Sequence, residues 1–409
     1  MKFNKWTLAL ATAGVISYGS VALAEEAPHQ VLTALSSTTL SGYIDTSANW
    51  RPGNNQGMLP GRTFDGGTKQ DGFNLNIVSL TLEKPLDEGQ WSAGYKAQLV
   101  FGPDAGYYTT TSDFNPLGGV DGSSDFNIKN AYAALRAPVG NGIDIKAGVF
   151  DTLVGYEVFE SANNPNYSRS YGYALEPTHH TGILASYHIN DMVSVAAGVA
   201  NTAFGPINGK FGIVAGKTTL DSSQKTYMAA VTVTLPESTG PLAGTALYAG
   251  VVDGRAFGNP EDSTSYYTGV TLKTPLEGLA VGAAVDYIEN KPFNGTAFAA
   301  GSLENWAWAT AVYASYQATE QLRLNARGDY TRGTDGTFYD RSADGMRGGN
   351  NELASLTLTA DYSLWSSLVT RLEGRWDHAL NGDRAFANAA GKPDDNNALT
   401  VALNMIYKF

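Results

Sequence analysis

The chain has 409 residues, of which 43% are hydrophobic, 46 are glycine and 22 are tyrosine, and it contains no cysteine. This apolar and aromatic content excludes an intrinsically disordered protein. The formal charge of −12 argues against nucleic acid as a partner, because phosphate binding needs a basic surface. The lack of cysteine is compatible with passage through an oxidising compartment without a disulfide framework.

The first 24 residues have the pattern of a secretory signal peptide. Lys2 and Lys5 precede a largely apolar stretch at 6–16, and small residues at 22–24 form a cleavage site. We therefore expect cleavage after Ala24 and exclude this leader from the fold. Its removal takes away two lysines, so the mature chain carries 25 basic against 39 acidic residues, a charge of −14.

The mature chain is predicted to contain one domain. The segment 25–39 is too short for a core of its own, and we expect it to be a periplasmic lead-in. The remainder, 40–409, contains no apolar stretch of about twenty residues that would predict a membrane-spanning helix.

Turn signals of two sizes alternate along this domain. Short turns are predicted at 85–90, 138–142, 189–191, 236–244, 275–278, 317–321 and 363–367. Long loops rich in Gly, Asn and Asp are predicted at 52–72, 103–125, 151–179, 202–225, 253–264, 289–304, 332–351 and 379–397. These connections delimit sixteen strands. The fold class is therefore all-β, a closed antiparallel transmembrane barrel with short periplasmic turns and long extracellular loops.

Alternation of residue character supports this barrel. In 91–101, Trp91 and Leu99 lie on one face of the strand and Lys96 lies on the other. Such a strand suits a wall with lipid outside and water inside. In 73–84 the apolar parity changes around Ile77 and Val78, which predicts a β-bulge or a misplaced strand boundary.

The loop at 151–179 is the best candidate for a pore constriction. It is rich in tyrosine and phenylalanine, which indicates that part of it packs against the barrel. Its charged candidates are Asp151, Glu157, Glu160, Glu176 and Arg169. A solvated extracellular connection is the alternative for a loop of this length.

Basic residues follow the inward parity of the predicted wall. They are Lys96, Lys146, Arg323, Arg327, Arg371 and Arg375. We hypothesise that this basic wall faces the acidic loop and creates a transverse field that orients polar solutes. In the alternative interpretation, Glu373 and Asp377 simply neutralise Arg371 and Arg375.

The final strand alternates up to the last residue. Leu399, Leu403, Tyr407 and Phe409 share one face, and Asn404 lies on the other. A terminal Phe after such a strand resembles the signal by which bacterial outer-membrane barrels are recognised for assembly. We therefore expect Tyr407 and Phe409 to serve as an assembly signal, with the barrel-assembly machinery as a partner.

The stretch 131–187 resembles the outer-membrane porins of the OmpL-like β-barrel family. The resemblance rests on the Leu-X-Ala-Pro-Val-Gly turn at 135–140, on 155–157, on the Asn-Tyr-Ser-Arg-Ser run at 166–170 and on His-Thr-Gly at 180–182. It implies a porin in the outer membrane that lets small hydrophilic solutes and ions diffuse, without a cofactor. It also implies that 151–179 folds inward, and a homotrimer is expected by analogy.

Competing functions lack a strong pattern. Neither a GxSxG elbow nor an HExxH motif accompanies the five histidines, so a barrel enzyme is the less favoured alternative, together with an adhesin or structural barrel. His179 and His180 could form a metal or base site, but exposed loop histidines are the simpler interpretation. A Ca²⁺ site from Asp121 and Asp125 is a further alternative. A secreted soluble β-protein would need polar outward positions, which this chain does not have.

Overall fold

The computed structural model describes most of the mature chain. The described residues are 37–53, 59–89, 91–108, 114–115, 119–120, 125–210, 224–256, 262–290, 305–339, 349–387 and 393–409. The predicted signal peptide and the first part of the predicted lead-in lie outside them. Thr39, which we assigned to the lead-in, is the first residue of the first strand.

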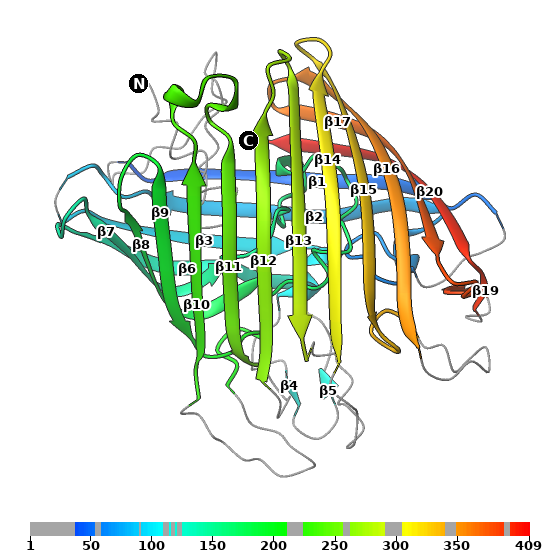
Figure 1. The fold of residues 1–409 in the computed structure, drawn as a ribbon, viewed down its shortest axis with the longest axis horizontal. Helices are drawn as coiled ribbons and strands as arrows, with labels where there is room; N and C mark the ends of the chain where they lie inside the picture. Colours follow the sequence, from blue (N-terminus) through cyan, green and yellow to red (C-terminus); the bar gives the residue numbers. More distant parts are fainter. Residues whose placement is uncertain are drawn as a thin grey trace.

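Sixteen antiparallel strands form one closed barrel (Figure 1). The strands are β1 (Thr39–Trp50), β2 (Gly72–Lys84), β3 (Ala93–Phe101), β6 (Phe126–Ala137), β7 (Ile143–Asp151), β8 (His179–His188), β9 (Val193–Ala200), β10 (Thr226–Thr234), β11 (Ala246–Arg255), β12 (Asp262–Lys273), β13 (Leu279–Glu289), β14 (Trp306–Gln317), β15 (Leu322–Thr334), β16 (Asn350–Trp365), β17 (Leu368–Ala379) and β20 (Asn397–Lys408). Each pairs with the next, and β20 pairs with β1 to close the ring. The predicted fold class and strand number are confirmed.

Short elements decorate the long loops. Two small hairpins are formed by β4 (Phe114–Asn115) with β5 (Gly119–Val120) and by β18 (Phe386–Ala387) with β19 (Pro393–Asp395). Single-turn helices η1 (Gly67–Lys69), η2 (Pro103–Tyr107), η4 (Ser161–Asn163) and η5 (Glu237–Leu242) lie in connections. No helix among the described residues is long and apolar enough to cross a membrane.

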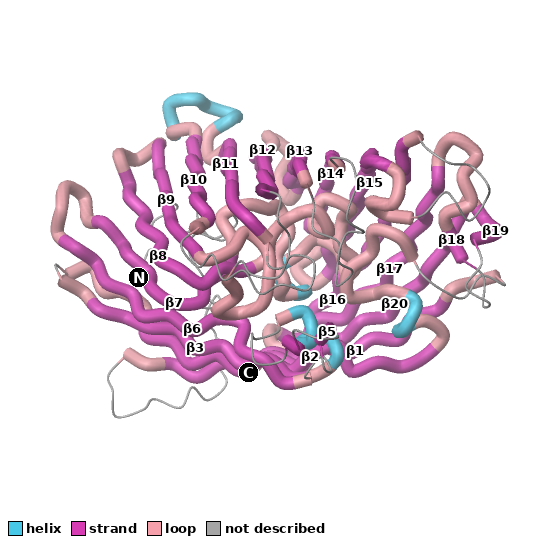
Figure 2. The backbone as a smooth tube through the Cα atoms, turned by 90° about the horizontal axis from the view of Figure 1, so that it is seen from below, coloured by secondary structure: helices cyan, strands magenta, loops and turns pink. Residues whose placement is uncertain are grey.

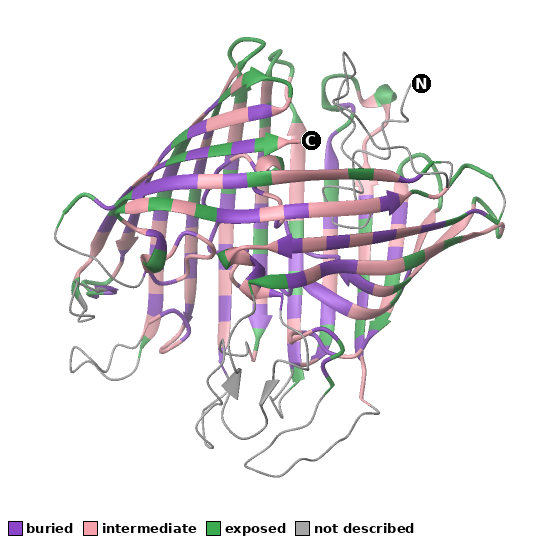
Figure 3. Ribbon diagram, turned by 180° about the vertical axis from the view of Figure 1, so that it is seen from behind, coloured by how far each residue is buried: buried purple, intermediate pink, exposed green. Residues whose placement is uncertain are grey.

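Burial alternates along the strands (Figure 3). On β20, Leu399, Leu403 and Tyr407 are exposed, whereas Asn404 is fully buried. Apolar and aromatic side chains therefore cover the outside of the barrel, and polar side chains turn inward. This arrangement suits a barrel whose outer surface meets lipid.

Two β-bulges interrupt this alternation and turn polar residues inward. On β2, Asp45 of β1 pairs with Ile77 and the next residue pairs with Leu75, so Asn76 is the extra residue. This confirms a bulge near the predicted parity change. On β6, Gln98 of β3 pairs with Asn130 and Leu99 pairs with Ile128, so Lys129 is the extra residue. Both extra residues are buried inside the barrel.

Candidate functional site

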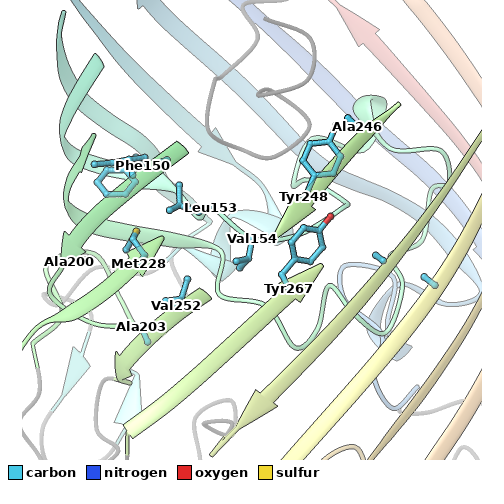
Figure 4. Packing of buried hydrophobic residues seen from close by; sticks show 14 of the residues in the cluster. Phe150, Leu153, Val154, Ala200, Ala203, Met228, Ala246, Tyr248, Val252 and Tyr267 are labelled. Carbon is cyan, nitrogen blue, oxygen red and sulfur yellow. The ribbon is translucent and has the colours of Figure 1, made fainter. Parts of the chain in front are cut away.

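The connection between β7 and β8, residues 152–178, lies inside the barrel, and we refer to it as the strap. Figure 2 shows loop segments within the ring of strands. The strap starts on an apolar part of the inner wall, where Leu153 and Val154 join a cluster with Met228, Val252 and Tyr267 (Figure 4). A 4.2 Å stack of Tyr156 on Tyr313 extends this contact. Hydrophobic burial thus fixes the first part of the strap.

The middle of the strap contacts the polar part of the inner wall through Arg327 of β15, the cross-strand neighbour of Tyr313. Its Nη1 lies 2.9 Å from Oε1 of Glu157 and donates to the carbonyl of Ser168 at 2.6 Å. The Arg327 and Glu157 side chains are 0% and 1% exposed. The structure therefore places the predicted wall residue Arg327 against the predicted loop residue Glu157, and both are enclosed by protein.

Arg371 and Arg375 of β17 also hold the strap. Arg371 donates to the carbonyls of Ser161 and Asn164 at 2.7 and 3.0 Å. Arg375 donates to the carbonyl of Arg169 at 2.5 Å. Both arginines are buried, so their donors support backbone that would otherwise lack partners.

In the alternative interpretation, Asp377 and Glu373 neutralise these two arginines. Only one of the two predicted pairs is present. Arg375 lies 2.8 Å from Asp377, whereas Arg371 lies 2.9 Å from Asp361 and not against Glu373. Glu373 instead accepts hydrogen bonds from the backbone N–H groups of two strap residues, Tyr167 at 2.6 Å and Ser168 at 2.9 Å. Sequence reasoning missed this role, because the position of the strap is not encoded in the strand itself.

Lys129, the extra residue of the β6 bulge, is a buried wall cation that pairs with the end of β7 and with the strap. Its Nζ lies 2.7 Å from Asp151 and 3.1 Å from Glu160. Burial alone would raise the pKa of Glu160, but the Lys129 and Lys96 ammonium groups and a hydrogen bond from Gln98 together lower it. The parity change that the bulge causes in 126–131 is the sequence signal that could have revealed Lys129.

A minority of the predicted site residues contact solvent. The side chains of Asp151, Glu160 and Arg323 are 30%, 21% and 39% exposed. Arg323 lies 2.6 Å from Asp361, and Lys146 lies 4.9 Å from the ring centre of Tyr132. Lys96 is buried on β3 and interacts electrostatically with Asp151 and Glu160.

Arg169 forms no ion pair with a wall carboxylate among the residues that the structure describes. Its guanidinium donates to the strap carbonyls of Val158, Tyr167 and Phe159, and it lies 5.6 Å from the ring centre of Phe64. Arg169 therefore stabilises the strap's own turn rather than charging the lumen.

The histidine interpretation was wrong. His179 and His180 are the first residues of β8 and are buried, not exposed in a loop. His180 is hydrogen-bonded to Thr152 and to the carbonyl of Thr202. No group of three potential metal ligands occurs among the described residues. Of the Ca²⁺ candidates, Asp121 lies outside the described residues.

The C-terminal residue takes part in barrel closure. Phe409 and Gly42 of β1 exchange two backbone hydrogen bonds of 2.8 and 3.0 Å. The rings of Tyr407 and Phe409 stack with centres 6.5 Å apart. The predicted assembly residues thus lie on the seam where the last strand meets the first.

Solved structures with this architecture are outer-membrane proteins. The channel DcaP of Acinetobacter baumannii has a TM-score of 0.56 and 15% identity, over 91% of this chain and 97% of that chain. An anion-selective porin from Comamonas acidovorans has a TM-score of 0.55 and 12% identity, over 91% and 99%. OmpT of Vibrio cholerae in its trimer form has a TM-score of 0.54 and 12% identity, over 91% and 99%. At these identities the likeness establishes the fold.

Sequence comparison gives a more specific result. A family model described as "Putative beta-barrel porin-2, OmpL-like" matches residues 37–409, which include the entire barrel. No curated protein matches the chain.

Proposed function

Because the chain belongs to the family "Putative beta-barrel porin-2, OmpL-like", we propose that it is an outer-membrane porin whose strap forms the constriction of a diffusion channel for small hydrophilic solutes and ions. The observation that carries this proposal is the path of the strap across the lumen. It contacts the apolar wall at Val154 and the polar wall at Arg327 and Arg371. A sixteen-strand ring is otherwise too wide for side chains to fill.

The solvent-accessible charges are proposed to set the field in the passage. Asp151 and Glu160 contribute negative charge at the strap, and Arg323 contributes positive charge on β15. Lys96, although buried, adds positive charge beside both acids, and Lys146 adds positive charge near Asp151. The buried group of Glu157, Arg169, Arg327, Arg371 and Arg375 instead maintains the shape of the constriction.

The proposal includes no catalysis and no cofactor. A barrel enzyme would need a nucleophile or base that reaches solvent, and His179 and His180 do not, because both are buried. An adhesin or structural barrel without conductance is the competing function.

We further propose three kinds of partner. The exposed apolar belt fits outer-membrane lipid, and the Tyr407 and Phe409 seam fits recognition by the barrel-assembly machinery. A homotrimer is proposed because one structure of the same fold was solved in a trimer form. The leader 1–24 is proposed to be cleaved after Ala24.

Planar bilayers test the function directly. The purified mature chain should form discrete, voltage-independent conductance steps in KCl. A variant lacking residues 157–170 should give larger steps, because the strap no longer narrows the lumen. A folded, heat-modifiable barrel that never conducts would favour the adhesin or structural alternative.

A further inference from the structure

Two carboxyl groups join the C-terminal part of the strap to the barrel wall. Glu176 of the strap and Asp286 of β13 form a side-chain hydrogen bond, and the two residues are 7% and 4% exposed. Asp286 lies so close to the strap that a Cβ added to Gly172 would be 2.4 Å from its Oδ2. Asp286 is therefore packed closely against the strap backbone.

This contact requires a proton. Carboxylates accept hydrogen bonds and cannot donate them, so one member of a hydrogen-bonded pair must be protonated. Oδ1 of Asp286 is buried without a hydrogen-bond partner, so a charge on this oxygen would not be compensated by a donor. The pair accordingly holds one proton between two chain segments 110 residues apart in sequence, from 176 to 286.

The groups that surround the pair in the described part of the chain are acidic or phenolic. The titratable groups that act on it are Glu157 of the strap, Tyr173 of the strap, Tyr107 of η2 and Tyr267 of β12. Glu157 is already paired with Arg327. Among the described residues, no basic side chain acts on either carboxyl. Burial and the charge of Asp286 raise the pKa of Glu176 well above its ordinary value.

We propose that Glu176 and Asp286 form a proton-binding latch that fastens the strap to β13 and is released when the proton is lost. Once both groups are ionised, two negative charges face each other in a buried site without a cation. Their repulsion and desolvation are relieved when the strap end moves away from the wall and water enters. The inference rests on the proposed function, because release of the strap widens the constriction.

Single-channel recording across pH tests the latch. Conductance of the wild-type channel should rise as the pH is raised beyond the ordinary titration range of glutamate, because burial raises the pKa of Glu176. Glu176→Gln should abolish this rise, because its amide still donates to Asp286 without titrating. Asp286→Asn should also abolish it, because only one charge can form. Glu277→Gln, which changes an exposed carboxyl in the adjoining turn, should retain the rise.

Infrared titration provides a readout independent of conductance. The wild-type barrel should lose the absorption of one protonated carboxyl over the same pH range, and both latch variants should lack this change. A wild-type channel whose conductance stays constant, or variants that keep the rise, would overturn the latch. If the barrel does not conduct at all, the proposed porin function fails, and the infrared titration still decides whether the pair holds the proton.

Discussion

Arg327 on β15 and Glu157 on the strap form an ion pair that is almost completely enclosed by protein, with Nη1 and Oε1 2.9 Å apart. An enclosed pair of this kind holds two segments together because removing one partner leaves an uncompensated buried charge. The pair therefore connects the polar wall to the constriction.

We expect Glu157→Ala to detach the middle of the strap. The loss of one partner from a buried pair costs about 3 to 5 kcal/mol. The barrel should remain folded, because its strand pairing does not involve Glu157, while single-channel conductance and current noise increase. The double variant Glu157→Ala/Arg327→Met should recover part of the docking energy, because it removes both charges of the pair and Arg375 still lies 4.0 Å from Asp329. Wild-type conductance in Glu157→Ala would contradict the assignment.

Reversal of the exposed charge at Arg323 should change ion selectivity. Its side chain is 39% exposed, so Arg323→Glu replaces a positive charge at the lumen by a negative one. The reversal potential in a KCl gradient should shift toward cation preference. The partner of Arg323, Asp361, is 4% exposed and also lies 2.9 Å from Arg371, so this carboxylate keeps one cation and the barrel should remain folded.

Lys84→Glu is the matched control for charge. Lys84 ends β2 on the outward parity shared by Leu80 and Leu82, and it pairs with Tyr95 across the strands. The same charge change on the outside of the barrel should leave the reversal potential near the wild-type value. Equal shifts in both variants would show that overall charge, rather than the lumen, determines selectivity.

Gly42→Ala should weaken barrel closure. A Cβ at this position would lie 2.4 Å from the carbonyl oxygen of Ser79 and 2.7 Å from the ring of Phe409. Overpacking of this kind costs about 1 to 3 kcal/mol. The yield of the heat-modifiable folded form on a detergent gel should fall, and conductance per channel should not. Gly374→Ala, where a Cβ meets no atom within 4 Å, should fold normally.

The Asp104 carboxyl of η2 should make stability depend on pH. Burial raises its pKa to about 6, although Lys69 at 2.5 Å opposes the shift. Between about pH 4, where an unfolded Asp titrates, and pH 6, the folded protein binds a proton that the unfolded chain does not. The free energy of unfolding should therefore decrease as pH rises across this window. Urea unfolding at a series of pH values should show this slope in the wild type and lose it in Asp104→Asn.

The strands could be predicted from sequence because turn chemistry and a period of two are local properties. Even the bulge at Asn76 could be predicted, because it changes the alternation of apolar residues within 73–84. Which arginines contact solvent and which are enclosed by the strap could not be predicted in this way. Arg323 and Arg327 share a strand face, yet one meets solvent and the other is enclosed, because the strap crosses only Arg327. The roles of Glu373 and Lys129 depend on the same tertiary relationship.

The strap's hydrogen-bonding partners also impose an order on assembly. Those on β15 and β17 lie between 158 and 210 residues further along the chain. The strap can contact Lys129 of β6 earlier, but it cannot complete its docking before these late strands have joined the sheet. Non-local contacts of this kind form slowly. The complete narrowing of the lumen is consequently a late step of folding, which depends on strands near the end of the chain.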